Sequence, residues 1–466
     1  MATVAEQKQK QQPVVRVAVD EFARLAGRQS AGRGNGSAWL ERLRSAGMDR
    51  FKAVGFPTGK EEAWRFTNIQ PIARTEFQLA TSDLTANFDD ALAPFTLRNA
   101  AAVELVFLNG TFAPGFSKIE ALPNGVRVSS LAEAVKHDVE IVERSLGKLA
   151  DIQKNPFVAL NTGFIHDGAF VHVARGAAIE SPIHLLFLST PAARPTATHT
   201  RVLVVAEENS DVRLVETYAG HGAGIYFTNA VTEVFAGDNA HVDHYKIQQE
   251  TIEAYHVSTT QVKLGRAATF TSHSASMGGL LTRNDVNAEM AGAGAYATLN
   301  GLVLISGKQH VDNHTLLDHA QPNCPSHELY KHVLDGESTG VFKGQILVRQ
   351  IAQKTDSKQS SKSLLLSDNA TMNSQPALEI YADDVKCTHG STIGPVDQDM
   401  MFYLRTRGVS KEAARHLLTY AFAADITRRI KVEPVRRRIE DFLAAQHGLP
   451  QDLRITDVGL HNEAAR

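Results

Sequence analysis

The chain has 466 residues, of which 43% are apolar and 21% are charged, and this composition excludes collagen-like and wholly disordered proteins. Its formal net charge of −3 argues against a general binder of nucleic acid or anionic membranes, because both need a strong positive field. The two cysteines, Cys324 and Cys387, are too few for a disulfide framework or for a four-cysteine metal site within one chain.

Residues 1–150 are predicted to form an N-terminal helical and mixed region. The polar start lacks the apolar stretch of a secretory signal, and no later apolar run reaches membrane-spanning length, so we expect a cytoplasmic protein. Apolar residues recur every three or four positions from Val17 to about Val54, around a break at 30–37, which predicts helices. The segment Gly55–Lys60 has one residue too few between its glycines for a phosphate-binding loop, so ATPase activity is not expected of this chain.

Residues 151–395 are predicted to form a parallel β-helix core. Short runs rich in Val, Thr, Ile and Tyr are separated by small polar turns, and no long amphipathic helix lies between them. The turns fall near Gly176, Ser210, Asn239, Arg266, Gly294, Ser338 and Asn369. All but one of the intervals between them are similar in length, which is typical of a repeat architecture whose ends are open. A large β-sandwich is the alternative.

Residues 396–466 are predicted to form a C-terminal helical domain. A short helix over 397–406 is followed by Gly408 as a C-terminal cap and by Ser410 as the N-cap of the next helix. Pro434 suits the first turn of a last helix, and residues 450–466 are expected to be a tail. The segment 428–438 carries six basic residues, which form either a solvated helix face or a docking surface for an acidic protein patch.

Histidines gather in the second half of the chain, at His310, His314, His319, His327, His332 and His389. On a strand, His310, Asp312 and His314 would share one face and His319 would point the other way. A site of two histidines and one carboxylate is conceivable there. The alternative is that these polar residues face solvent or satisfy turns.

Cys387 and His389 are two positions apart, so on a strand their side chains project to the same side. The pair can supply a thiolate and an imidazole to a soft metal, or the imidazole can lower the pKa of the thiol. Two ligands are too few for a cluster, so another chain supplies the rest or the pair is structural. Cys324, in a turn-like stretch before Pro325, suits a half-buried inert thiol.

Several stretches resemble the SufB/SufD family of iron–sulfur cluster assembly proteins. The longest is PALEIYADDVKCTHGSTIGPVDQDMMFYLRTRG at 376–408, supported by stretches at 310–334, 340–370 and 420–426. GFPTGKEEAWRFTN at 55–68 resembles the SufD branch, and the chain lacks the additional cysteines usual in SufB. The resemblance implies a mainly β fold with a right-handed parallel β-helix core between an N-terminal helical region and C-terminal helices.

The resemblance also implies a scaffold subunit of a SufBCD complex that is not itself an enzyme. Such a subunit pairs with SufB through the β-helix and docks the ATPase SufC through helices at about 397–445. His389 matches an interface histidine expected to hold a transient iron–sulfur cluster beside a SufB cysteine, and Cys387 matches its neighbouring cysteine. The positions that the resemblance implies for ATPase docking are Tyr403, Arg405, Arg407, Gly408, Tyr420 and Phe422.

Other interpretations remain open from the sequence. The exposed β edge could pair with itself in a homodimer when SufB is absent. A free-standing metalloprotein would use His310, Asp312 and His314 as ligands. A β-helix enzyme acting on polysaccharide would need a secretory signal and an aligned row of carboxylates, which the sequence does not offer. We expect no cofactor to be tightly bound by the isolated chain.

Overall fold

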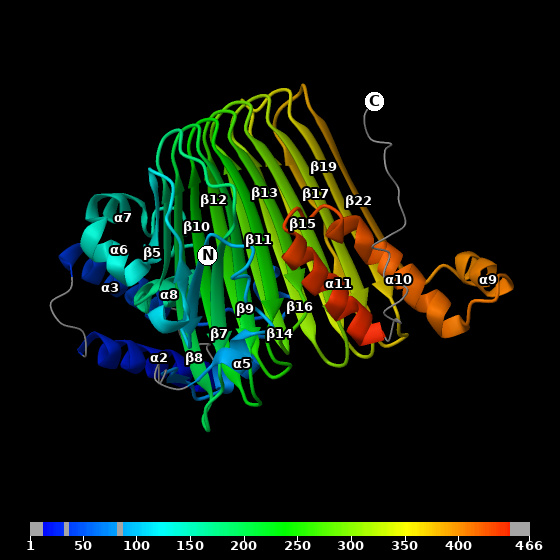
Figure 1. Cartoon of the computed structure of the whole chain (residues 1–466), viewed down its shortest axis with the longest axis horizontal. Coiled ribbons are helices and arrows are strands. Elements are labelled where there is room, and N and C mark those ends of the chain that lie inside the picture. Colours follow the sequence, from blue (N-terminus) through cyan, green and yellow to red (C-terminus); the bar gives the residue numbers. More distant parts are fainter. Residues whose placement is uncertain (1–12, 32–36, 82–86, 448–466) are drawn as a thin grey trace.

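A computed structural model describes residues 13–31, 37–81 and 87–447 of the chain. Its centre is a parallel β-solenoid of about 8 turns, with helices on either side (Figure 1). The predicted mainly β class and parallel β-helix core are therefore confirmed. The predicted tail at 450–466 lies outside the described residues.

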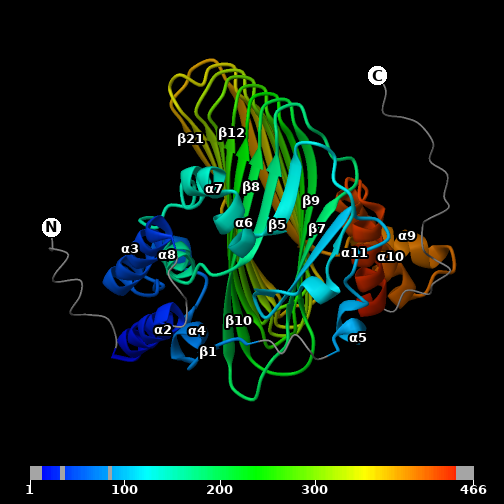
Figure 2. The same cartoon turned by 60° about the vertical axis from the view of Figure 1, so that its left-hand side comes forward.

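The solenoid consists of two sheets, which we call sheet A and sheet B, and each turn contributes one strand to each (Figure 2). The strands of sheet A are β5 (Val126–Ser130), β6 (Gly168–Val173), β8 (Thr196–Ala206), β10 (Tyr226–Ala236), β12 (Tyr255–Leu264), β14 (Leu281–Met290), β16 (His310–His319), β18 (Thr339–Val348), β20 (Thr371–Ser374) and β21 (Ala377–Ile380), with β1 (Gln78–Leu79) beside β8. Those of sheet B are β2 (Val103–Leu108), β7 (Ile183–Ser189), β9 (Asp211–Gly220), β11 (His241–Gln249), β13 (Thr269–Ser276), β15 (Tyr296–Ile305), β17 (Pro325–Leu334), β19 (Asp356–Leu365) and β22 (Lys386–Pro395), with the short β3 (Thr111–Phe112) and β4 (Lys118–Ile119) beside β2. Strands β2 and β5 show that the N-terminal region already contributes to both sheets.

One corner of the solenoid repeats a left-handed backbone conformation in each turn. The residues with positive φ at this corner recur at nearly equal intervals and are Asn209, Asn239, Ala267, Gly294, Asn323 and Lys354. Each donates its backbone N–H to a carbonyl of the next turn, as Asn209 does to Asp238 at 2.9 Å. Asparagine and glycine tolerate this conformation best, so the corner fixes where each turn ends.

This ladder explains the interval that broke the predicted rhythm. The turn at Asn323 belongs to the same corner as Gly294 and is absent from the turns predicted from the sequence. The predicted turn at Ser338 belongs to the opposite corner, where Gly336 has a φ of +63°. The prediction that Gly294 and Ser338 mark consecutive turns of one repeat is therefore wrong, because the two positions belong to different corners.

The interior between the two sheets has an apolar part and a polar part. Val242, Phe270, Leu317 and Ile346 belong to one apolar cluster that runs through successive turns. Beside it the interior carries charged and polar side chains that are almost completely buried. Burying such groups is costly unless they are hydrogen-bonded, so they must be paired across the interior.

A buried charge network in the early turns meets this requirement. Glu216 accepts a hydrogen bond from the Tyr218 hydroxyl at 2.7 Å and is 3.0 Å from the Nε2 atom of His244. Lys246 donates from Nζ to the Oδ1 atom of Asn284 at 2.8 Å, across the interior between the sheets. Burial lowers the pKa of Lys246 to about 8, and the nearby Glu216 carboxylate opposes that shift.

N-terminal helices cover the outer face of sheet A. They are α2 (Pro13–Ala31), α3 (Ala38–Val54), α4 (Gln70–Arg74) and α8 (Pro156–Gly163). Helices α6 (Leu131–His137) and α7 (Val139–Ser145) cover the first strands, and α5 (Asp89–Leu92) lies nearer sheet B (Figure 2). Two short 3₁₀ turns are η1 (Glu62–Trp64) and η2 (Pro114–Phe116). Phe22 of α2 lies at the centre of an aromatic cluster with Phe51, Phe56 and Phe164, at ring-centroid distances of 5.9 to 6.4 Å. The predicted N-terminal helices are thus present, and part of the predicted break between them lies outside the described residues.

The segment 55–68 is a strap across sheet A and not a nucleotide loop. Gly55 ends helix α3, with a φ of +70° and its N–H bonded to the Phe51 carbonyl, whereas a phosphate loop would open a helix. Trp64 is buried beneath the Arg283 guanidinium of β14 at 4.4 Å, and Glu62 pairs with Lys343 of β18 at 2.6 Å. The strap therefore joins the N-terminal region to later turns of the solenoid.

C-terminal helices lie against sheet B. Helix α9 (Gln398–Thr406) has Asp397 as its N-cap, α10 (Lys411–Thr427) is capped by the Ser410 hydroxyl as predicted, and α11 (Glu433–His447) follows. Helices α10 and α11 pack on the sheet, whereas α9 projects away from it (Figure 1). Among the described residues, no helix is both long and apolar enough to span a membrane.

Candidate functional site at the open end of the solenoid

The solenoid ends at strands β20, β21 and β22, and no described strand covers their outer edges. Strand β22 pairs with β19 on one side, and β20 and β21 pair with β18. Apolar side chains are exposed here, with Ile393 47%, Tyr381 64% and Ile380 38% accessible. Unpaired strand edges with exposed apolar side chains are typical of a surface that receives another strand.

Cys387 and His389 both lie on β22, at this open end. Their register partners on β19 are Ser357 and Gln359, which are buried in the interior. Side chains in register on parallel strands share a face, so Cys387 and His389 point to the interior side. They are half-buried and exposed, respectively, because no further described turn covers them.

The donor atoms of this pair, and not their electrostatics in the isolated chain, suit a metal site that is shared with another molecule. Burial raises the pKa of the Cys387 thiol, an effect that Asp356 adds to and the Ser357 backbone opposes. Thiolate and imidazole are soft donors of the kind that bind iron and zinc. Among the residues that the structure describes, no group of three or more His, Cys, Asp or Glu side chains could hold a metal ion. The two donors therefore need others from outside this part of the chain to complete a cluster site.

A buried polar pair lies one turn behind His389. Gln359 donates from Nε2 to the Oε2 atom of Glu328 on β17 at 2.6 Å, and both side chains are buried. Burial raises the pKa of Glu328 to about 7, with the hydrogen bond from Gln359 acting against it. At the rim, the hydroxyls of Ser391 and Ser374 are 2.9 Å apart and join the two sheets. No sequence motif marks Gln359, Glu328, Ser391 or Ser374, and only the register of the strands brings them to the open end.

Cys324 lies in the loop before β17, away from the soft donors at the open end. It is completely buried, and its Sγ donates to the Gly292 carbonyl at 3.4 Å. Burial raises the pKa of its thiol. The interpretation of an inert thiol agrees with this environment, although the side chain is fully buried and not half-buried.

The residues His310, Asp312 and His314 do lie together on one face of β16, and His319 lies on the other. The carboxylate of Asp312 is already engaged, because Arg283 and the Thr67 hydroxyl both donate to its Oδ2 atom at 2.5 Å. The Arg283 charge holds the pKa of this buried carboxyl far below its usual range. A cation bound there would compete with a buried guanidinium, so the cluster fastens the strap to the sheet and is a poor metal site.

The residues implied for ATPase docking divide into two groups. Tyr403, Arg405, Arg407 and Gly408 are exposed at α9, where the Arg407 guanidinium lies 5.3 Å from the Tyr403 ring. Gly408 has a φ of +88°, as its predicted role after the helix requires. Tyr420 and Phe422 lie on α10 and are half-buried against sheet B and the last turn.

Helix α9 carries two exposed apolar residues that are not among the positions predicted from the sequence. Phe402 is 70% and Met400 57% accessible, next to Tyr403 at 59%. We call Met400, Phe402 and Tyr403 the α9 patch. Exposed large apolar side chains on a projecting helix mark a contact surface.

The basic segment 428–438 is largely paired within the chain. Arg429 pairs with Asp425, Arg437 with Glu433, and Lys431 with Asp243 of β11. Arg438 lies 5.7 Å from the Phe95 ring, and burial lowers its pKa to about 10. These contacts favour the interpretation of a helix face that is balanced by its own neighbours.

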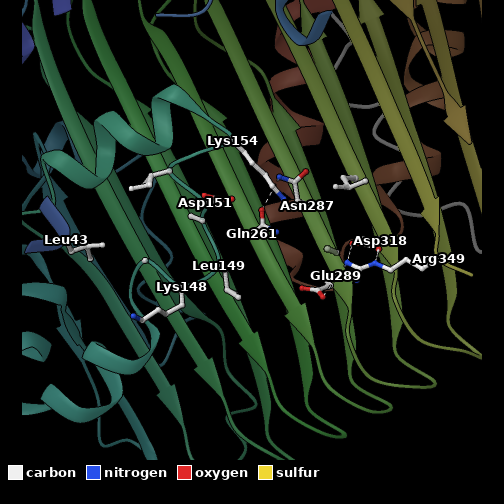
Figure 3. A pocket seen from close by; sticks show the side chains of 15 residues that line it. Leu43, Lys148, Leu149, Asp151, Lys154, Gln261, Asn287, Glu289, Asp318 and Arg349 are labelled. Atoms are coloured by element: carbon white, nitrogen blue, oxygen red, sulfur yellow. Dashed lines mark hydrogen bonds and ion pairs between the residues drawn. The ribbon is translucent and has the colours of Figure 1, made fainter. Parts of the chain in front are cut away.

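A cavity of about 380 Å³ lies on the outer face of sheet A, beside the loop that precedes α8 (Figure 3). Lys154 points toward Gln261 and Asn287, and Arg349 pairs with Asp318 at 2.6 Å. Neither Cys387 nor His389 lines it. The cavity therefore lies apart from the soft donors at the open end.

Two family models match the chain over most of its length. Residues 187–422 match the SufBD core domain of SUF system FeS cluster assembly, and residues 28–185 match the SufBD protein N-terminal region. The first match covers most of the solenoid, including Cys387, His389 and the α9 patch.

Several relatives match most of the chain. An iron-sulfur cluster assembly SufBD family protein of Synechocystis is 30% identical, over 93% of this chain and 97% of that protein. The iron-sulfur cluster assembly protein SufD of Escherichia coli is 29% identical, over 84% of this chain and 89% of its own. SufD of Bacillus subtilis is 26% identical, over 86% and 92%, respectively.

Proposed function

The chain belongs to the SufB/SufD family of iron–sulfur cluster assembly proteins and is most like SufD, and we propose that it is the SufD-like scaffold subunit of a SufBCD-type complex. The observation that carries this proposal is the open end of the solenoid. There, two soft donors lie on an edge strand that no described strand covers. Within the part of the chain that the structure describes, the two donors lack further ligands and the outer edge of the strand lacks a pairing strand.

The partner at this end is a SufB-like subunit. Strand edges pair readily with another strand, and a second solenoid of the same family offers an edge of matching spacing. Ile380 and Ile393, exposed in the isolated chain, would be buried by such a contact. In the absence of SufB, the same edge can pair with a second copy of this chain as a homodimer.

The iron–sulfur cluster is the cargo of this interface. His389 and Cys387 contribute an imidazole and a thiolate from this side, and the partner contributes further thiolates. A shared site of this kind accounts for two ligands on a chain that has only two cysteines. A reducing compartment such as the cytoplasm keeps both thiols free, as the structure has them.

The C-terminal helices dock a SufC-like ATPase. The α9 patch projects beyond the solenoid, with Arg405, Arg407 and Gly408 beside it, and offers apolar area with basic flanks. Helix α10, with Tyr420 and Phe422, connects this patch to sheet B. In this proposal ATP hydrolysis belongs to the partner and this chain is a non-catalytic scaffold, which fits a strap at 55–68 that ends a helix and does not open one.

Co-purification tests the assembly. We expect the tagged chain to capture SufB-like and SufC-like subunits from the same cell, and we expect Phe402→Asp with Tyr403→Ser to lose the ATPase alone. Failure of the unaltered chain to capture either partner would refute the complex.

His389→Ala tests the ligand. The variant should leave the complex intact and lower its iron and sulfide content after reconstitution. His327→Ala, a half-exposed histidine on the outer side of sheet B, is the matched control. Equal iron and sulfide in the two variants would refute the ligand role.

A further inference from the structure

The Gln359 side chain lies in the interior directly behind His389. The two residues are register partners on β19 and β22, so their side chains are neighbours on one face of sheet B. Adjacent strands are about 4.8 Å apart, which is within the reach of a glutamine and an imidazole. Gln359 is 3% exposed, whereas His389 is at the surface.

A glycine on the opposite sheet makes room for this amide. Gly344 of β18 faces the interior, and a Cβ atom there would collide with the Nε2 atom of Gln359 and lie 2.7 Å from the Phe342 ring. The backbone of Gly344 does not have a positive φ, so conformation does not demand glycine at this position. Glycine is needed here because a larger side chain would fill the space that the Gln359 amide occupies.

The carboxylate of Glu328 fixes which way the amide faces. The ionised carboxylate, which is the form present at about pH 8, only accepts hydrogen bonds, so the Nε2 end of Gln359 is the end that lies 2.6 Å from it. The other end, Oε1, is buried and has no hydrogen-bond partner among the described residues. A buried carbonyl without a donor is costly and calls for one nearby.

We propose that Glu328 and Gln359 position His389, with the Gln359 carbonyl accepting one imidazole N–H so that the other ring nitrogen presents its lone pair at the open end. This inference rests on the proposed ligand role of His389. Both residues are positioning residues, because neither reaches the cluster itself.

The chemistry of metal-bound histidine supports this arrangement. A histidine that binds a metal through one nitrogen commonly donates its other N–H to a carbonyl or carboxylate, which fixes the tautomer and the ring orientation. Loss of such a partner typically weakens metal binding by about 10–100-fold. The series Glu328–Gln359–His389 supplies the partner from inside the solenoid, where the amide cannot turn over without losing its bond to the ionised Glu328 carboxylate.

The first test measures the tautomer of His389 and needs no cluster. The full-length chain is labelled with ¹⁵N-histidine at about pH 8, well above the ordinary imidazole pKa, and the His389 signals are identified by their loss in His389→Ala. We expect the ratio of the two tautomers to differ about fivefold from that of a free imidazole, which is the factor that one hydrogen bond of ordinary strength gives. In Gln359→Leu, and in the more flexible Gln359→Met, the ratio should return to that of a free imidazole. An unchanged ratio would overturn the proposal.

The second test measures iron bound by the reconstituted complex at limiting iron. Gln359→Leu should weaken iron binding roughly tenfold or more. It should cause no further loss when combined with His389→Ala, because it acts through that residue. The control is Gln345→Leu on β18, since Gln345 also donates to a glutamate of the next strand, Glu379 at 2.8 Å, but on the outer side. An equal effect of the control, or a further loss in the double variant, would show a merely structural role and overturn the proposal.

The two hypotheses fail differently. If His389→Ala leaves iron and sulfide unchanged, the ligand role itself is wrong, whatever the tautomer. If His389→Ala lowers them but Gln359→Leu does not, the ligand role stands and the positioning by Gln359 is wrong.

Discussion

The buried carboxyl of Glu328 makes the stability of the solenoid depend on pH. Its pKa is about 7 in the folded chain, against an ordinary value of 4.5, chiefly because burial disfavours the charged form. Between pH 4.5 and about 7 the unfolded chain therefore releases a proton that the folded chain keeps. The contribution of Glu328 to the free energy of unfolding therefore falls as the pH rises through this window and is constant above it.

Replacing Glu328 by Gln should remove this dependence. A glutamine can still accept the hydrogen bond from Gln359 but cannot ionise. The difference between the two pKa values corresponds to about 3 kcal/mol at pH 8, since one pKa unit is about 1.4 kcal/mol. We expect Glu328→Gln to match the unaltered chain at about pH 4.5 and to be more stable by up to about 3 kcal/mol at about pH 8.

The assay is thermal or urea unfolding of both chains at half-unit steps across this pH range. The quantity that matters is the difference between the two chains, because shared titrations cancel in it. Glu379→Gln, at an exposed position on β21, controls for loss of a carboxylate in general. A difference that is independent of pH, or one that shrinks as the pH rises, would refute the reasoning.

Three further predictions concern stability. Lys246→Met removes the buried ammonium that donates to Asn284 and Ser258, and it should cost about 1–3 kcal/mol for the acceptors left unsatisfied, measured by urea unfolding; a loss under about 0.5 kcal/mol would contradict the network. Arg283→Met removes the guanidinium that pairs with the buried Asp312 and covers Trp64, and it should expose the strap at 55–68 to limited proteolysis, whereas Arg266→Met on an exposed corner should not. Asn239→Ala should cost about 1 kcal/mol because of its φ of +56°, whereas Asn239→Gly should be nearly neutral; equal costs would contradict the conformational argument.

Much of the architecture could be read from local pattern. The strand-forming runs, the nearly constant interval between turns, the caps at Ser410 and Gly408, and the shared side of Cys387 and His389 all depend on neighbours in sequence. The rhythm failed only between Gly294 and Ser338, where turns of two corners have similar composition. A local pattern cannot distinguish them, because the corner to which a turn belongs is set by stacking on other turns.

The sequence by itself determined a repeating β core, two soft donors on one strand and the lack of a phosphate loop, since each of these follows from residue type and spacing along the chain. Only the tertiary structure decided that Arg283 forms an ion pair with Asp312, that Gln359 and Glu328 lie behind His389, and that the α9 patch is exposed. The physical reason is that a solenoid brings residues one full turn apart in the sequence into direct contact. Burial and pairing between turns, which set charge and accessibility, are therefore properties of the stacked turns and not of any one segment.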